Sequence, residues 1–291
     1  MIKKGIILAG GSGTRLAPLT KAVNKQLLPI YDKPLIYYSL SVLMLAKIKK
    51  ILIIVNKGDT KKFKDLFSFG NDLGLEISYL EQKTPNGIPE GLILGEKFIG
   101  KDNVALMLGD NFFYGQGFTK QLLSASKKLK NSTIFVYPVN NPSSFGIVSL
   151  GKNNKIYKIE EKPKKTKSNL AITGLYFFDN KAVKLAKKLK FSKRKELEIV
   201  DLLKNYNRLG QIKVEKLGRG SAWLDNGEIE NLQDASKFVE GLEKRQGLKI
   251  ACLEEIALNN KWIKTKQVSK RIQFYGNSNY SKYLKKLIQN N

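Results

Sequence analysis

Short apolar runs alternate with amphipathic segments along the first half of the chain. Residues 6–9, 51–55, 76–79, 104–108 and 133–138 are such runs, too short for a helix and typical of strands inside a sheet. Residues 34–47 repeat apolar side chains at helical spacing, and residues 60–70 fit a second helix capped by Asp59 or Thr60. A strand, a helix and a strand in this order predict an α/β fold with neighbouring parallel strands.

The second half of the chain changes from strands to helices. Residues 145–148, 156–160 and 171–178 continue the strand pattern, whereas residues 228–247 carry apolar side chains at helical spacing. Residues 275–291 form a lysine-rich amphipathic tail. The change predicts one large domain over residues 1–227 and a C-terminal helical extension over residues 228–291.

The composition of the chain excludes several classes of protein and of active site. The chain is 42% hydrophobic and has no apolar run near the roughly 20 residues of a membrane helix, so we expect a cytoplasmic protein without a membrane partner. It has no histidine, which excludes histidine acid–base catalysis and histidine-bound zinc. Its one cysteine, Cys252, is expected to be a half-buried structural thiol.

The net charge of +27 raises the question of nucleic-acid binding. Arginine is rare among the 52 basic residues, however, and the lysines are scattered along the whole chain. A lysine-rich solvated surface explains this pattern best, and adventitious polyanion binding or attraction of anionic substrates is the alternative. We therefore expect no specific nucleic-acid partner.

The first strand leads directly into a glycine-rich turn at residues 10–15. Glycine lets consecutive main-chain N–H groups point at a bound phosphate, and Arg15 adds a forked cation for phosphate oxygens. The turn is not a P-loop, because neither Gly-Lys pair of the chain, at 100 or 151, is followed by Ser or Thr. It is not a dinucleotide fingerprint either, since Leu16 stands where the third glycine is needed.

Two aspartates follow apolar stretches, Asp110 after residues 104–108 and Asp225 after residues 222–224. In open α/β sheets ligands gather at the carboxyl ends of strands, so Asp110 is placed for chemistry rather than for packing. A magnesium ion on a nucleotide takes one or two protein carboxylates, and phosphate oxygens and water complete its shell. Asp110 and Asp225 are therefore the candidate ligands of Mg²⁺.

The sequence Gly-Gly-x-Gly-Thr-Arg-Leu at 10–16, with Lys25 ten residues after the arginine, resembles the signature of the sugar-phosphate nucleotidylyltransferases. The resemblance spans nearly the whole chain and is tight at 104–111, 160–163, 173–177 and 222–225. It implies a Rossmann-like three-layer α/β/α fold with a mixed, mostly parallel central sheet. In the branch that it resembles most, a thymidylyl group passes from dTTP to α-D-glucose 1-phosphate, giving dTDP-glucose and pyrophosphate, the first step of dTDP-L-rhamnose biosynthesis.

The resemblance also implies which residues form the site, with Mg²⁺ as cofactor. The catalytic residues would be Arg15, Lys25, Asp110, Lys162 and Asp225, with the two aspartates as metal ligands. The nucleotide would contact Leu8, Gly10, Gly11, Ser12, Gly13, Thr14, Gln26, Gln82, Pro85, Gly87 and Asp110. The sugar phosphate would contact Asn111, Gly146, Glu161, Lys162, Thr173, Gly174, Tyr176, Arg194, Glu196 and Trp223. A homotetramer with feedback by a dTDP-sugar would use the extension and Gly115, Arg219, Lys249 and Glu255.

Three other functions agree with parts of the sequence. Thymine and uracil differ by one methyl group, so a UTP:glucose-1-phosphate uridylyltransferase is the alternative within the family. The chain has Pro89-Glu90 where the thymidylyl branch most often has Ala-Gln. A non-catalytic nucleotide-sugar-binding protein would have no use for all five catalytic residues, and a nucleic-acid binder would depend on the positive surface alone.

Overall fold

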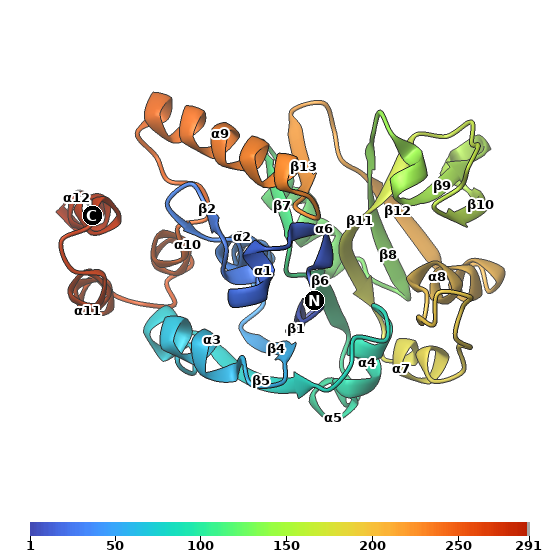
Figure 1. The fold of residues 1–291 in the computed structure, drawn as a ribbon, viewed down its shortest axis with the longest axis horizontal. Coiled ribbons are helices and arrows are strands. Elements are labelled where there is room, and N and C mark those ends of the chain that lie inside the picture. The colour runs from blue at the N-terminus through green and yellow to red at the C-terminus, as the bar shows by residue number, and fades with distance from the viewer. Residues whose placement is uncertain (290–291) are drawn as a thin grey trace.

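The structure is a computed structural model that describes residues 1–289 (Figure 1). Residues 290–291, at the end of the predicted extension, lie outside the described residues. Within the described part, nine strands form the main sheet. They are β1 (Lys4–Ala9), β4 (Lys50–Asn56), β5 (Glu76–Gln82), β6 (Val104–Leu108), β8 (Ser132–Pro138), β9 (Gly146–Leu150), β10 (Ile156–Glu161), β11 (Leu170–Phe178) and β12 (Ile212–Lys216).

The centre of this sheet is parallel, as the alternation of strands and helices predicts. The strand order is β10-β9-β11-β6-β1-β4-β5, and β8 pairs with β11 and β12. β1 is parallel to β4 and β6, and β4 is parallel to β5. β11 is antiparallel to β6, β8 and β9. The mixed sheet is confirmed, and β1 and β6 end at the same edge.

Helices cover both faces of the sheet (Figure 1). Alternate residues point to opposite faces, Ile7 and Ile53 into one core and Ile6 and Leu52 into the other. The first face carries α2 (Ile36–Leu45), α3 (Thr60–Phe67) and α6 (Phe118–Lys127). On this side α10 (Leu253–Asn259) packs against α2, and α11 (Thr265–Tyr275) and α12 (Asn279–Gln289) pack against α10 and each other. The second face carries α4 (Glu90–Leu94), α5 (Glu96–Ile99), α7 (Lys181–Ala186) and α8 (Ile199–Arg208). The three-layer α/β/α fold is confirmed.

A third, smaller core lies under α9 (Ile229–Gln246), the helix predicted over residues 228–247. It joins α9 to the two-stranded sheet of β7 (Asn111–Gly115) and β13 (Ser221–Asp225), and to the hairpin of β2 (Pro29–Ile30) and β3 (Lys33–Pro34). The ring of Phe112 is fully buried there and meets the edge of Phe238 at a centroid distance of 5.7 Å. The remaining short elements are α1 (Leu19–Ala22), η1 (Thr14–Leu16), η2 (Lys25–Leu27), η3 (Asn71–Leu73), η4 (Pro142–Ser144) and η5 (Lys152–Asn154).

Two local expectations are wrong. The second helix ends at Phe67 rather than at residue 70, because the chain turns at Ser68, whose φ of 48° is outside the helical range. Cys252 is not half-buried but 1% exposed, and burial raises the pKa of its thiol. It lies in the main core, where the hydroxyl of Tyr280 is 3.4 Å from its sulfur.

The C-terminal helices are fixed by a buried polar cluster around Glu254, which is 0% exposed. Its carboxylate accepts hydrogen bonds from Arg271 Nε at 3.0 Å, the Tyr275 hydroxyl at 2.8 Å and the Tyr280 hydroxyl at 2.7 Å. The Tyr275 hydroxyl is also 3.0 Å from that of Tyr37 on α2, so the cluster joins the extension to the main sheet. The domain boundary at 227 stays a prediction.

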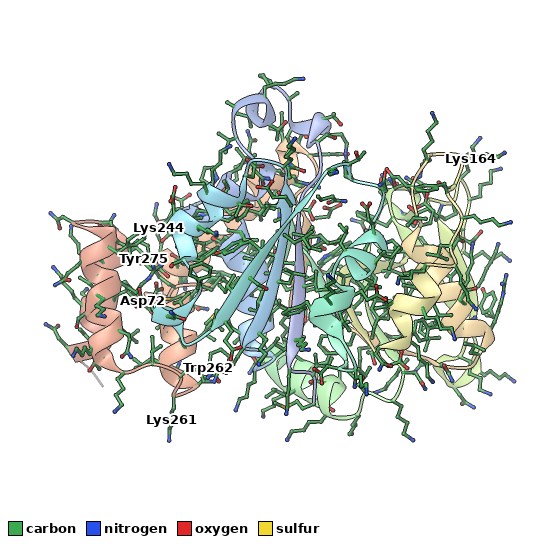
Figure 2. The ribbon with its side chains drawn as sticks, turned by 90° about the horizontal axis from the view of Figure 1, so that it is seen from below. Asp72, Lys164, Lys244, Lys261, Trp262 and Tyr275 are labelled. Carbon is green, nitrogen blue, oxygen red and sulfur yellow. The ribbon has the colours of Figure 1, made fainter. Side chains whose placement is uncertain are left out.

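Lysine side chains project from separate parts of the surface, as Lys164, Lys244 and Lys261 show in Figure 2. Among residues 1–289, no helix has the length and apolar character needed to span a bilayer. The cytoplasmic location stays a prediction.

We expect Arg271→Ala to lower the free energy of unfolding by roughly 3 kcal/mol, because it leaves the buried carboxylate of Glu254 without its charged partner. Its exposed neighbour provides the control, and Lys270→Ala is expected to change stability by less than about 0.5 kcal/mol. Urea unfolding followed by circular dichroism measures both. Equal stabilities of the two variants would contradict the role of Arg271.

Candidate functional site

A cleft of about 1050 Å³ opens at the edge where β1 and β6 end. Most of the predicted site residues line it, from the glycine turn to the sugar-phosphate segments. These are Leu8, Gly10, Gly11, Ser12, Arg15, Gln26, Gln82, Pro85, Gly87, Asp110, Asn111, Gly146, Glu161, Lys162, Thr173, Gly174, Tyr176, Arg194, Glu196, Trp223 and Asp225. Gly13, Thr14 and Lys25 do not line the cleft itself.

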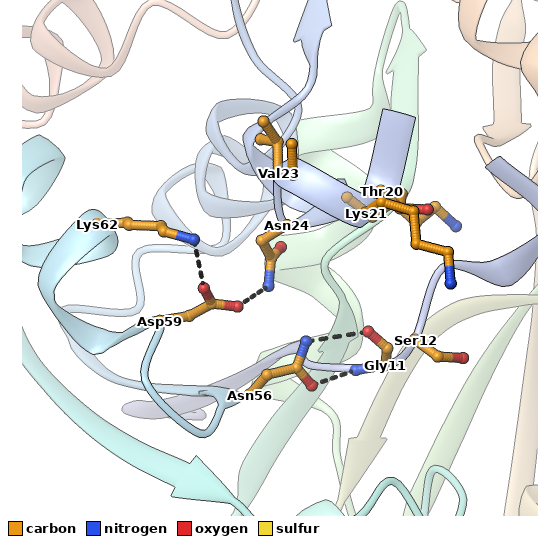
Figure 3. Close-up of a pocket in the computed structure, with 11 residues that line it drawn as sticks. Gly11, Ser12, Thr20, Lys21, Val23, Asn24, Asn56, Asp59 and Lys62 are labelled. Carbon is orange, nitrogen blue, oxygen red and sulfur yellow. Dashed lines mark hydrogen bonds and ion pairs between the residues drawn. The ribbon is translucent and has the colours of Figure 1, made fainter. Parts of the chain in front are cut away.

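Asn56, at the end of β4, fixes the glycine turn through two hydrogen bonds to Gly11 (Figure 3). Its Oδ1 accepts a hydrogen bond from the Gly11 N–H at 2.8 Å, and its Nδ2 donates to the Gly11 carbonyl at 3.0 Å. The Gly11 N–H is therefore already bonded within the protein and does not point at a phosphate, in contrast to the expectation for this turn. The φ of +110° at Gly11 nevertheless explains why glycine is needed there.

Asn24 and Asp59 hold the next segment, which carries Lys25 (Figure 3). Asn24 Nδ2 donates to the Ala9 carbonyl at 3.1 Å and to Asp59 Oδ2 at 2.8 Å. Asp59 Oδ1 accepts from Lys62 at 2.9 Å, so its carboxylate serves these contacts and does not cap α3 as predicted. Lys25 is thereby fixed close to β6.

Lys25 and Asp110 form an ion pair beside the cleft. Asp110 Oδ2 accepts from Lys25 Nζ, and Asp110 Oδ1 accepts from Asn111 Nδ2 at 2.9 Å. Burial disfavours the charged carboxylate, but the charge and hydrogen bond of Lys25 outweigh it, so the pKa of Asp110 lies below its ordinary value. Asp110 is therefore ionised at neutral pH.

Asp225 lies next to Asp110 because β13 pairs with β7, which places Asp225 opposite Asn111. The Asn226 N–H also donates to the Asp110 carbonyl at 3.1 Å. Burial and the neighbouring charge of Asp110 raise the pKa of Asp225 to about 6. Two half-buried carboxylates that repel each other are suited to share a cation. No set of three or more Cys, Asp or Glu side chains within residues 1–289 is arranged to hold a metal, so its other ligands would be substrate and water.

Asn111, predicted to contact the sugar phosphate, uses its side chain on the protein itself. Its Oδ1 accepts from Trp223 Nε1 at 2.6 Å and from the Gly174 N–H at 3.0 Å, while its Nδ2 donates to Asp110. A Cβ at position 174 would lie 2.6 Å from Asn111 Oδ1. Close packing against Asn111 thus requires glycine at 174, and the predicted contact of Gly174 with the sugar phosphate stays a prediction.

Arg194, which also lines the cleft, is surrounded by acidic side chains. Its Nη2 lies 3.1 Å from Glu161 Oε1 and 2.6 Å from Glu198 Oε2, and its Nε donates to Glu198 Oε1 at 3.1 Å. Glu196 is 3.7 Å away. Burial, aided by the charge of Glu198, raises the pKa of Glu161 against the opposing charge of Arg194. Glu198, which sequence reasoning missed, is the residue that holds the guanidinium.

The remaining cations of the site are Lys162 and Arg15. Lys162 follows β10 with φ of 43°, and its N–H donates to the Phe145 carbonyl at 3.0 Å. Arg15 is well exposed and pairs with Glu228 at 3.3 Å. Both cations line the cleft, so both are within reach of an anionic ligand.

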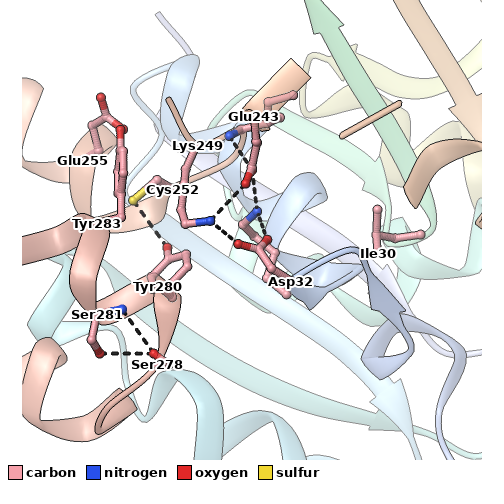
Figure 4. A network of polar contacts seen from close by, with 12 residues as sticks. Ile30, Asp32, Glu243, Lys249, Cys252, Glu255, Ser278, Tyr280, Ser281 and Tyr283 are labelled. Atoms are coloured by element: carbon pink, nitrogen blue, oxygen red, sulfur yellow. Dashed lines mark hydrogen bonds and ion pairs between the residues drawn. The ribbon is translucent and has the colours of Figure 1, made fainter. Parts of the chain in front are cut away.

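The predicted regulatory residues lie in two different regions. Gly115 pairs with Ser221 at the end of β7, and Arg219 stands just before β13. Lys249 is bound to Asp32 and to Glu243, the latter at 2.9 Å, while Glu255 accepts from the Tyr283 hydroxyl at 2.7 Å (Figure 4). Within residues 1–289, no hydrogen bond or ion pair joins the first two to the last two.

Known proteins resemble this chain in sequence and in fold. A family model for nucleotidyl transferases matches residues 4–241. The chain belongs to the nucleotidyl transferase family. Within this family it is 51% identical to the glucose-1-phosphate thymidylyltransferase of Neisseria meningitidis serogroup A, over 98% of this chain and 99% of that protein. It is 45% identical to the protein of the same name from Mycobacterium tuberculosis, over 99% of this chain and 100% of that protein.

Solved structures share the fold of the family. The crystal structure of a proposed glucose-1-phosphate thymidylyltransferase from Bacillus anthracis, in complex with a sucrose, has a TM-score of 0.75 and is 36% identical in sequence. The match covers 81% of this chain and 94% of that chain. UDP-glucose pyrophosphorylase with UDP-glucose has a TM-score of 0.74 and 27% identity, covering 84% of this chain and 100% of that chain. The curated thymidylyltransferases are the more similar in sequence.

The coupling of the two aspartates can be tested in the metal-free protein. Asp110→Asn is expected to lower the pKa of Asp225 from about 6 toward the roughly 3.9 of a free aspartate, because it removes the negative charge that disfavours the ionised form. Side-chain carboxyl ¹³C NMR titration measures this pKa. The matched control is Asp234→Asn, exposed on α9, which should leave it unchanged. The coupling would be refuted if Asp225 titrated alike in both variants.

Proposed function

We propose that this chain transfers a thymidylyl group from dTTP to α-D-glucose 1-phosphate, giving dTDP-glucose and pyrophosphate, the first step of dTDP-L-rhamnose biosynthesis. The curated relatives at 45–51% identity carry this enzyme's name. The observation that carries the proposal is one cleft with two kinds of lining. The glycine turn, Asp110 and Asp225 line it together with the two cations Lys162 and Arg194.

The proposed reaction needs charge and positioning rather than a base. The nucleophile is a phosphate oxygen of the sugar phosphate, which is already anionic, so a chain without histidine lacks nothing. Lys162 and Arg194 would hold this phosphate in line with the α-phosphorus of the nucleotide. Arg15 and Lys25 would hold the triphosphate and favour the departure of pyrophosphate.

We propose Mg²⁺ as the cofactor, with Asp110 and Asp225 as its protein ligands. The fit is supported by the raised pKa of Asp225 beside ionised Asp110, since a cation would relieve this repulsion. When bound, the metal would neutralise negative charge on the nucleotide phosphates. Asn111 would orient Asp110 through its 2.9 Å hydrogen bond.

One buried hydrogen-bond acceptor in the cleft is available to a nucleotide. The buried Gln26 Oε1 has no hydrogen-bond partner among the described residues, and Gln26 lines the cleft. A nucleotide hydroxyl could satisfy it.

The homotetramer and the feedback by a dTDP-sugar also remain proposals, which rest on the family resemblance.

A panel of dTTP, UTP and other nucleoside triphosphates with sugar 1-phosphates, scored by pyrophosphate release with Mg²⁺ or with EDTA, tests the function. We expect dTTP with glucose 1-phosphate to be the best pair and EDTA to abolish release. Higher efficiency with UTP would favour the uridylyltransferase alternative. Nucleotide-sugar binding without release would favour a binding protein, and salt-sensitive oligonucleotide retention without release a nucleic-acid binder.

Lys25→Ala is expected to lower turnover by roughly two to four powers of ten, on the scale of losing a preorganised donor to the transition state. Its exposed neighbour on α1 serves as the control, and Lys21→Ala should retain turnover within about twofold. Pyrophosphate release at saturating substrates measures both. A loss under fivefold in folded Lys25→Ala would reject the role of Lys25.

A further inference from the structure

Glu90, in the first turn of α4, binds the loop that follows β5 although it does not line the cleft. Its Oε2 accepts hydrogen bonds from Gln82 Nε2 and from the backbone N–H of Asn86, the latter at 2.9 Å. Its Oε1 accepts from Asn86 Nδ2 at 2.7 Å. The carboxylate thus has three donors around it.

These contacts determine which way the Gln82 amide points. An ionised carboxylate only accepts hydrogen bonds, so the group of Gln82 that faces Glu90 must be the NH₂. The oxygen of Gln82 then faces the other way, toward Gly10, where a built Cβ would lie 2.8 Å from Gln82 Oε1. Gln82 and Gly10 both line the cleft, and within residues 1–289 no donor reaches this oxygen.

We infer that Glu90 is a positioning residue that selects the nucleotide base by holding Gln82 Oε1 toward it as a fixed acceptor. This inference rests on the proposed function, and it takes the base as the part of the nucleotide that contacts Gln82. Thymine and uracil carry an N3–H donor, whereas N3 of cytosine is an acceptor. A fixed amide oxygen therefore bonds the first two and faces the lone pair of the third. Cytosine would have to shift within the cleft to offer its N4 amino group instead.

The Glu90→Gln variant should preserve this arrangement, which makes it a matched control. The backbone N–H of Asn86 cannot turn round, so it requires an acceptor at the place of Glu90 Oε2. In Glu90→Gln the new amide oxygen would occupy that place and still accept from Gln82. The new NH₂ would face the Asn86 side chain, whose amide can rotate to accept. In Glu90→Leu the side chain has no acceptor and would release Gln82.

The test compares the binding of dTTP and dCTP, each with Mg²⁺, to the full-length protein by isothermal titration calorimetry. We expect the wild type to favour dTTP by about tenfold or more, and Glu90→Leu to reduce the Kd ratio of dCTP to dTTP by about tenfold or more. Glu90→Gln should keep the ratio within about threefold. The ratio does not depend on the active fraction of a preparation, and Glu90→Ala replaces Glu90→Leu if that variant does not fold.

Two results would overturn the inference. One is an unchanged ratio in Glu90→Leu, and the other is an equal drop in Glu90→Leu and Glu90→Gln, which would assign the effect to charge rather than to a hydrogen-bond acceptor. Failure of the proposed function is a separate outcome. In that case the wild type would release no pyrophosphate from dTTP and glucose 1-phosphate, whatever its base selectivity.

Discussion

The site depends on the side-chain amide of Asn111, which is 2% exposed and bonds three partners, on β13, on β11 and in the turn between β6 and β7. Through Trp223 it ties β13 to β7, through the Gly174 N–H it ties both to β11, and through Nδ2 it orients Asp110. A buried amide that is fully hydrogen-bonded has one low-energy orientation, since any rotation would leave a buried polar group unpaired. The two aspartates and the sugar-phosphate half of the cleft are thus held in one frame.

The sequence predicted the main sheet well because its signals are local. Short, continuously apolar runs such as residues 51–55 and 104–108 predict strands that are covered on both faces. The small sheet of β7 and β13 was not foreseen, since its strands are about a hundred residues apart and pairing at that separation leaves no local pattern. The third core under α9 depends on the same long-range pairing and was missed with it.

In the site, strand ends and the glycine turn indicated the glycines, Arg15 and Asp110, and the family resemblance implied the other residues; most of them line the cleft. The polar residues that hold these site residues in place by hydrogen bonds were missed. Asn56, Glu90 and Glu198 each fix a predicted residue through its polar group, yet in the sequence they are ordinary polar residues near an element's end. Only Asn56 had a usable signal, as the first polar residue after the buried run 51–55.

Several charges of the site form ion pairs with one another. Lys25 lies against Asp110, Arg15 against Glu228, and Arg194 against Glu161 and Glu198. The partners of Lys25 and Glu198 keep these largely buried charges from standing alone, which would be costly, whereas the pair of Arg15 and Glu228 is exposed. Under the proposed function, phosphate oxygens would take over the cations, and the freed Asp110 would turn to the metal beside Asp225. Binding would then exchange partners within a preformed set of charges, so little charge would have to be desolvated at the moment of reaction.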